Sequence, residues 1–184
     1  MSDIEIELSP VDHITTDALG PKGKRVFYIQ GTQGNQVVTV IAEKLQIQAL
    51  AIGAKQFLED IGERFPELSE VSSEYNQEFM KIMPPVDPLF RIADIGLGYN
   101  VEKDWVVLII HELIPENFET LDDDLAQEVG VIRFSCTRDQ LQALSEWGLE
   151  VVQSGRKICV QCGQLEEPDG HLCVKKNGGY KSYF

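Results

Sequence analysis

Apolar and polar residues alternate in six short stretches of the chain, a pattern typical of half-buried β-strands. The stretch that begins at Trp105 contains an unbroken Val-Val-Leu-Ile-Ile run, which predicts the most buried strand of the protein. Turn-forming residues follow several of the stretches, so we expect hairpins between neighbours. The predicted strands span Val11 to Asp17, Arg25 to Gln30, Val37 to Ala42, Phe90 to Tyr99, Trp105 to Leu113 and Val131 to Cys136.

Two longer segments have the apolar spacing of helices. In the first, Lys44 to Glu63, the apolar residues form one stripe. The second runs from Arg138 to Gln153; Thr137 and Gln140 form a capping box at its start, and Gly155 is placed to end it. The stripe of the first helix consists of Leu50, Ala54, Phe57, Leu58 and Ile61.

Residues 66 to 88 are polar, acidic and rich in proline, so they are interpreted as a connector between two halves. One short helical piece is expected within it, from Asn76 to Ile82. A second acidic segment, from Glu116 to Glu128, interrupts the later half. Carboxylates in such a segment are usually solvated, and the spacing of a calcium loop is absent.

The two halves share the order strand, strand, strand, helix. Gln46 to Leu50 matches Gln140 to Leu144 at the start of each helix, and Ile14 with Leu19-Gly20 resembles Ile92 with Leu97-Gly98. The pattern predicts an internal duplication with repeats 11 to 64 and 89 to 155, although any amphipathic helix that follows a strand would share part of it. We therefore expect an α+β fold with an antiparallel sheet and two long helices. The body is residues 1 to 155 and the tail residues 156 to 184.

The tail carries the spacing of a zinc site. A Cys-x-x-Cys turn at Cys159 and Cys162 supplies two thiolates, and His171 and Cys173 lie two residues apart after a Pro-Asp-Gly reversal. Three sulfurs and one nitrogen fill the tetrahedral shell that Zn²⁺ prefers and leave no position for a catalytic water. We expect one structural zinc ion per chain, whose binding energy orders a segment too short to fold alone. A redox pair would not need His171 and Cys173.

Charge and composition limit the partners. The chain has 30 acidic and 16 basic residues, a net charge of −14 and a pI near 4.5, which disfavours nucleic acid and anionic membranes. A nucleic-acid contact through the basic residues of the tail is a minor alternative. No apolar stretch approaches the roughly 20 residues of a membrane span, and the first residues do not resemble a signal peptide. We expect a cytoplasmic protein.

The turn and strand from Gly20 to Gln30 read Gly-Pro-Lys-Gly-Lys-Arg-Val-Phe-Tyr-Ile-Gln, and the tail carries the Cys-x-x-Cys and Pro-Asp-Gly-His-x-Cys motifs. Together these motifs resemble an uncharacterised bacterial family of repeat proteins, domain of unknown function family 3090. The resemblance covers nearly the whole chain, but Ile158, Val160 and Val174 stand where the family has prolines. It implies no reaction, and it implies an association with a histidine-phosphatase-like protein. The matching blocks are Gly20-Pro-Lys-Gly-Lys-Arg25-Val-Phe-Tyr-Ile-Gln30 at the start and Gly155-Arg156, Cys159-x-x-Cys162-Gly163, Pro168-Asp169-Gly170-His171-x-Cys173 and Asn177-Gly178 at the end.

Four other features have both a structural and a functional interpretation. Gly31 and Gly34 are explained by a hairpin turn better than by a phosphate-binding loop, since no helix follows them. Cys136 and His111 lie in predicted strands, so we expect a buried inert thiol and a hydrogen-bonded sheet histidine. Arg25 either makes an ion pair at the sheet edge or holds a carboxylate or phosphate.

The leading functional hypothesis is a non-enzymatic binding or adaptor module with a structural zinc. No nucleophile, base and orienting group can be assembled from the three histidines and Cys136. The alternative is an enzyme that acts on a small phosphorylated or anionic ligand, with Arg25 in a pocket between the halves. A concave pocket around Arg25 would favour the alternative, and a flat apolar patch would favour the adaptor.

Overall fold

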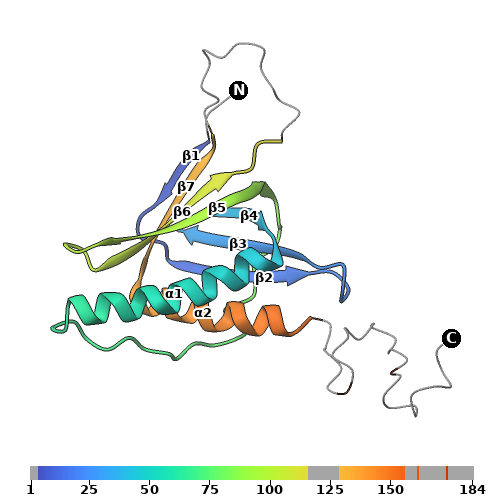
Figure 1. The fold of residues 1–184 in the computed structure, drawn as a ribbon. Helices are drawn as coiled ribbons and strands as arrows, with labels where there is room; N and C mark the ends of the chain where they lie inside the picture. The colour runs from blue at the N-terminus through green and yellow to red at the C-terminus, as the bar shows by residue number, and fades with distance from the viewer. Residues whose placement is uncertain (1–3, 116–128, 156–160, 162–172, 174–184) are drawn as a thin grey trace.

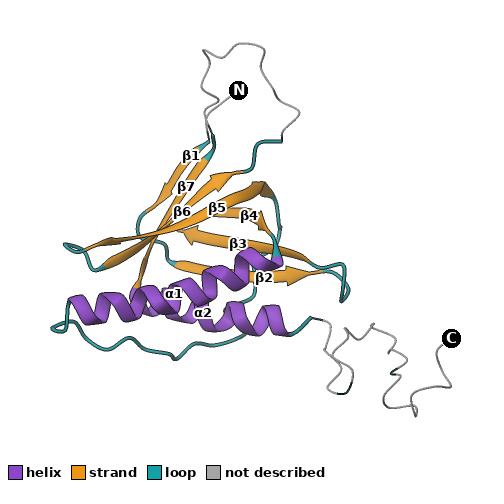
Figure 2. Ribbon diagram, viewed as in Figure 1, coloured by secondary structure: helices purple, strands orange, loops and turns teal. Residues whose placement is uncertain are grey.

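Along the described part of the chain, four strands and a helix are followed by three strands and a second helix (Figures 1 and 2). The computed structural model describes residues 4–115, 129–155, 161 and 173, and every structural statement below concerns these residues. The elements are β1 (Glu5–Leu8), β2 (His13–Leu19), β3 (Val26–Gln33), β4 (Gln36–Ala42), α1 (Lys44–Arg64), β5 (Pro88–Asn100), β6 (Trp105–Glu112), β7 (Val131–Thr137) and α2 (Arg138–Gln153).

The six predicted strands and both long helices are confirmed, with bounds shifted by a few residues. The capping box at the start of α2 is present: the Thr137 hydroxyl accepts a hydrogen bond from the Gln140 amide, and the Gln140 side chain accepts one from the Thr137 amide. Leu50, Ala54, Leu58 and Ile61 are buried, as the apolar stripe of α1 predicts. These features depend on local sequence, which explains why the pattern finds them.

The sheet is mixed, so the prediction of an antiparallel sheet is wrong at two places. Its order is β1-β7-β6-β5-β4-β3-β2, in which β1 runs parallel to β7 and β4 runs parallel to β5. β1, which the sequence pattern did not predict, has only four residues, two of them glutamates that fit strands poorly. Its pairing with β7 and the burial of Leu8 hold it in the sheet.

The sheet curls until its two ends meet. The end strands β1 and β2 are consecutive in the chain, and the residues between them bond to both sides: the Val11 amide to the Ser135 carbonyl at 2.8 Å and the Asp12 amide to the Thr32 carbonyl at 2.7 Å. A β-carbon on Gly31 of β3 would lie 2.7 Å from the ring of Phe134 on β7. Strands far apart in the sheet order therefore face each other across the core.

The two halves correspond strand by strand. β2, β3 and β4 have the same order and directions as β5, β6 and β7. The start of β5 pairs in parallel with β4 at Thr39–Pro88, and β1 pairs in parallel with β7 at the matching position, Glu7–Arg133. The long strand β5 therefore takes in the second half the sheet positions that β1 and β2 together take in the first.

The repeated glutamine of the two helix starts makes the same contacts in each half. The Gln46 side-chain amide donates to the Ile92 and Ala93 carbonyls at 3.1 Å each. The Gln140 side-chain amide donates to the Val11 and Asp12 carbonyls at 3.4 and 3.2 Å. The first residues of α1 are thereby bonded to β5, and those of α2 to the link between β1 and β2.

Ladder register corrects one of the sequence matches. Ile14 pairs with Gly31, which is opposite Val38, whereas Ile95 pairs with Ile110, which is opposite Ile132. Val38 and Ile132 stand the same distance before α1 and α2, so Ile95 is the counterpart of Ile14. The match of Ile14 with Ile92 was wrong by three residues, because the alternation of a strand does not identify its register.

The connector between α1 and β5 packs on the body instead of separating two halves. Ser72 and Tyr75 bond to Asp139 and Glu150 of α2, and Met80 is buried with its carbonyl accepting from the Thr15 hydroxyl of β2. The predicted helical piece from Asn76 to Ile82 is wrong: the backbone forms turns there. Contacts with β2 and β3 determine its path, and these are invisible in the local sequence.

Candidate functional site: a basic pocket between the two halves

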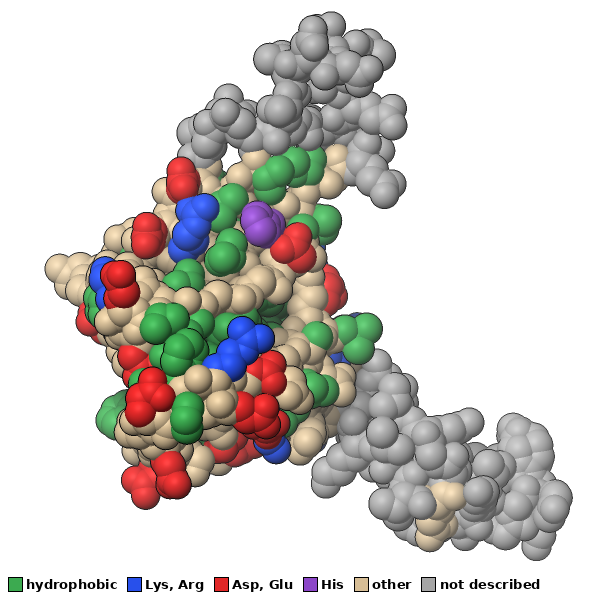
Figure 3. All heavy atoms as spheres, turned by 60° about the vertical axis from the view of Figure 1, so that its left-hand side comes forward, with side chains coloured by type: hydrophobic (Ala, Val, Ile, Leu, Met, Phe, Trp, Pro, Cys, Tyr) green, Lys and Arg blue, Asp and Glu red, His purple; other side chains and the backbone are tan. Residues whose placement is uncertain are grey.

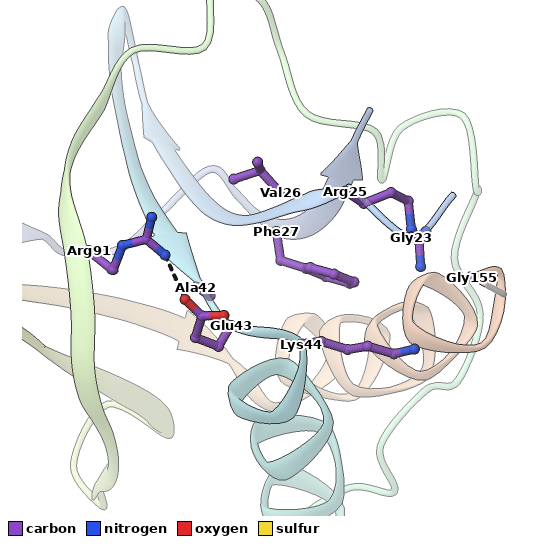
Figure 4. A pocket seen from close by; sticks show the side chains of 9 residues that line it. All are labelled: Gly23, Arg25, Val26, Phe27, Ala42, Glu43, Lys44, Arg91 and Gly155. Atoms are coloured by element: carbon purple, nitrogen blue, oxygen red, sulfur yellow. Dashed lines mark hydrogen bonds and ion pairs between the residues drawn. The ribbon is translucent and has the colours of Figure 1, made fainter. Parts of the chain in front are cut away.

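A pocket in the described structure lies where both halves meet. It has a volume of about 380 Å³ and opens between the N-terminus of α1, the starts of β3 and β5, and Gly155, the second residue after α2 (Figure 4). Arg25 and Lys44 come from the first half, and Arg91 and Gly155 come from the second. The complete lining is Gly23, Arg25, Val26, Phe27, Ala42, Glu43, Lys44, Arg91 and Gly155.

Arg25 spans from the start of β3 to the end of α2. Its Nη1 donates to Ser154 Oγ and its Nη2 to the Val151 carbonyl, both at 3.0 Å, and its guanidinium lies 5.0 Å from the centre of the Phe27 ring. Burial lowers the pKa of Arg25, and the charge of Asp17 opposes this effect. Among the residues that the structure describes, Arg25 makes no ion pair of the kind considered for the sheet edge. Its guanidinium caps the carbonyl end of α2, where a positive charge is favourable.

Lys44 brings a second positive charge beside Arg25. Figure 4 shows the two side chains converging near Gly155, next to the Phe27 ring. A β-carbon on Gly155 would lie 2.8 Å from Arg25 Nη2 and 3.4 Å from Lys44 Nζ, so the two nitrogens are no further apart than the sum of these distances. Gly155 leaves room that any other residue would fill. Lys44 makes no ion pair with any residue that the structure describes.

The opposite end of the pocket contains an ion pair. Arg91 Nη1 lies 2.6 Å from Glu43 Oε1, the dashed line in Figure 4. Both side chains are at least half exposed, so this pair adds little to stability and its groups remain accessible to a ligand. The lining thus has three cations and one carboxylate in a protein whose net charge is −14.

The same position in the second half is closed by an internal ion pair. Phe27 pairs with Ala42 in the first half, and Val106 pairs with Cys136 at the matching position of the second half. Arg25 stands two residues before Phe27, and Asp104 stands two residues before Val106. Arg25 and Asp104 are therefore counterparts. Lys44 and Arg138 are the first residues of their helices and are also counterparts. Arg138 Nε lies 2.7 Å from Asp104 Oδ1, and Nη2 lies 3.0 Å from Oδ2. The first half therefore has two cations where the second has a cation and a carboxylate.

The Arg138–Asp104 pair is well satisfied. Arg138 is buried and also donates to the Ser69 carbonyl at 2.8 Å, and the Tyr99 hydroxyl donates to Asp104 at 2.7 Å. The hydrogen bond from Arg138 holds the pKa of Asp104 below its ordinary value. Burial raises the pKa of Tyr99 to about 12, and the hydrogen bond to Asp104 is the second largest cause. In the second half, the cation at the first helical position, Arg138, is therefore neutralised by Asp104 within the protein.

The comparisons with known proteins identify the family without assigning a function. The profile of DUF3090, described as a protein of unknown function, matches residues 6–173. The chain belongs to this family. No curated protein and no solved structure matches it. Among the described residues, no helix is long and apolar enough to cross a membrane.

Three of the four predicted zinc ligands, Cys159, Cys162 and His171, lie outside the described residues of this DUF3090 member, so the structure does not test the site. The fourth, Cys173, is described and buried. The described ranges contain no group of three or more residues able to hold a metal ion. The acidic segment from Glu116 to Glu128 also lies outside them.

The remaining candidates have structural roles. Cys136 is fully buried, and burial raises the pKa of its thiol to about 12, in agreement with an inert core cysteine. His111 Nδ1 lies 2.8 Å from Asp94 Oδ1, as expected for a hydrogen-bonded sheet histidine. Gly34, with φ of 58°, is in the β3–β4 turn, but Gly31 lies inside β3, so the turn explains only one of the two glycines.

Proposed function

We propose that this DUF3090 protein is a binding module for a small ligand with a phosphate or carboxylate group, which occupies the basic pocket beside Arg25 and Lys44. One observation carries the proposal: the first half has two cations where the second half has the Arg138–Asp104 ion pair. An anion on the ligand would supply the charge that Asp104 supplies in the second half. The pocket is large enough for a phosphate ester, and Phe27 offers an apolar surface for the rest of the ligand.

Inorganic phosphate is the simplest probe of the pocket. At 20 mM phosphate, a site with a Kd of about 1 mM would raise the Tm by about 5 °C over chloride of the same ionic strength. Lys44→Gln should remove most of this increase, because Lys44 has no ion-pair partner in the described structure and its loss acts mainly on the ligand. Lys55→Gln, an exposed lysine on the same helix, is the matched control and should keep it.

An equal phosphate effect in Lys44→Gln and Lys55→Gln would contradict the site, as would an effect no larger than that of chloride. Arg25→Gln is a less clean test, because it also removes the cap of α2 and should cost about 1 kcal/mol of stability without any ligand. The Tm of Arg25→Gln in chloride, compared with that of the wild type, measures the loss of the cap alone. Any further difference in phosphate is then due to the loss of ligand binding.

An enzyme that acts on such a ligand is the second candidate, favoured by the position of the pocket between the two halves. Glu43 is the one carboxylate of the described lining, and Arg91 holds it. Both candidates require saturable binding, but only the enzyme would release inorganic phosphate from a monoester such as phenyl phosphate. Phosphorus NMR of the mixture over several hours distinguishes them.

The same proposal includes a structural zinc ion in the tail, held by Cys159, Cys162, His171 and Cys173. Its support is the ligand spacing, together with the burial of Cys173, which suits a thiolate in a closed tetrahedral site. Metal analysis of the purified protein should find about one zinc per chain. Cys136→Ala should retain it, since that thiol is in the core and is not a predicted ligand. Less than about 0.2 zinc per chain after metal-free purification and zinc reconstitution would contradict this prediction.

We further propose that the two halves arose by duplication. The shared strand order, the matching parallel pairings and the two equivalent glutamine contacts support this origin. Aligning the halves of other family members tests it, because related halves should both keep the glutamine of the third helical position.

An association with a histidine-phosphatase-like protein remains a prediction from the family resemblance. Affinity purification followed by mass spectrometry tests it, and repeated absence of such a protein would count against it.

A further inference from the structure

A second hollow lies between α1 and the later part of β5. It has a volume of about 300 Å³ and is largely apolar. Ala49, Leu50 and Gly53 line it from α1, and Asp94, Ile95 and Leu97 line it from β5. No atom lies within 4 Å of a β-carbon built on Gly53, so the groove is open at the middle of the helix.

The counterpart of this groove in the second half is filled by a tryptophan. Gly53 and Trp147 are each the tenth residue of their helix. Trp147 lies between α2 and β2: its indole Nε1 donates to the Thr16 carbonyl at 2.7 Å, and its ring packs edge-on against Tyr75 at 6.4 Å. Thr16 pairs with Ile29, and Leu97 pairs with Leu108. These two pairs occupy matching positions in the two halves of the sheet, so Thr16 corresponds to Leu97. The open groove therefore matches the site of Trp147 at the helix position and at the strand residue whose carbonyl accepts from the indole, but it lacks the tryptophan.

The groove is lined mainly by apolar residues, and Asp94 is the one charged residue among the described residues that line it. On α1, Leu45 and Ile52 are 76% and 58% exposed, which extends the apolar surface along the helix. Figure 3 shows one face of the molecule on which hydrophobic side chains gather, with Asp, Glu, Lys and Arg side chains next to them. Asp94 adds a carboxylate to the groove wall, and the net charge of −14 attracts a basic partner.

We propose that the groove between α1 and β5 is a docking site for a tryptophan side chain on a positively charged polypeptide segment of a partner protein. The indole takes the place that Trp147 has in the second half, and its N–H donates to the Leu97 carbonyl. Basic residues beside it lie near Asp94. Tryptophan suits such a site because it combines a large apolar area with one polar group that needs a partner. The site is separate from the basic pocket and does not depend on its ligand.

The test uses two short peptides and the full chain. The acetylated, amidated peptide Lys-Lys-Trp-Lys-Lys is titrated into ¹⁵N-labelled protein, with Lys-Lys-Ala-Lys-Lys as the control for charge alone. We expect saturable shifts of the Gly53, Ile95 and Leu97 amide signals with a Kd of roughly 0.1 to 1 mM, because one anchor side chain gives modest affinity. The alanine peptide should bind at least tenfold more weakly.

Two variants decide where the peptide binds. Gly53→Trp places an indole in the groove and should weaken peptide binding at least fivefold, whereas Gly53→Ala should leave it nearly unchanged. Both should fold, because the position is open and glycine is a poor helix former. Equal binding of the two peptides, absence of saturable shifts at the groove, or unchanged affinity in Gly53→Trp would overturn the proposal. Self-association of the wild type that Gly53→Trp abolishes would also overturn it, by assigning the groove to a second copy of the chain.

Discussion

Replacement of Gly31 with valine is expected to lower the free energy of unfolding by about 3 kcal/mol, the upper part of the range for overpacked cores. A β-carbon at this position would lie 2.7, 2.8 and 3.0 Å from three atoms of the Phe134 ring. Phe134 is fully buried, so the ring cannot move without displacing its neighbours. Urea denaturation measures the change.

Gly96→Val is the matched control, because Gly96 is also inside a strand and the nearest atom to its β-carbon is 4.0 Å away. It should change stability by less than about 1 kcal/mol. Combining Gly31→Val with Phe134→Leu should reveal a coupling energy of at least about 1 kcal/mol, since a smaller side chain relieves the contact. If Gly31→Val is as stable as the wild type, the close approach of β3 and β7, and with it the closure of the sheet, is wrong.

Cys159→Ser is expected to abolish stoichiometric zinc binding and to leave the body folded. Losing one thiolate opens the tetrahedral shell, and zinc sites of this class supply roughly 10 to 16 kcal/mol of binding free energy to segments that do not fold alone. The core of the described residues, in contrast, is built from α1, α2 and the sheet. Limited proteolysis should cut the variant after about Gly155 and release a stable remainder, while its zinc content falls to nearly none.

Cys136→Ala is the control in the opposite direction. It should keep the zinc and lower the stability of the body, because it removes a fully buried sulfur. If Cys159→Ser instead unfolds the whole chain in one transition, the division into body and tail at residue 155 is wrong, and the metal site belongs to the core.

The candidate pocket was only partly accessible from sequence. Arg25 could be singled out because a guanidinium next to a glycine turn and an apolar strand needs a partner. Lys44, Arg91 and Gly155 were not recognised, because each comes from a different element and only the fold brings them to Arg25. One signal was present: Lys44 occupies the helix position of Arg138 in the two matched segments. Its meaning required the structure, which shows that the counterpart of Arg25 is Asp104.

The sequence by itself determined the two helices and strands β2 to β7 of the body, because these depend on side-chain periodicity and capping within a few residues. Thr137 and Gln140 define the start of α2 in both the pattern and the structure. The tertiary structure alone decided which strands pair, in which register and across which faces. β1, the parallel pairing of β4 with β5 and the packing of Gly31 on Phe134 all depend on residues distant in sequence. Alternation along a strand indicates that one face is buried, but it carries no information on the neighbour that buries it.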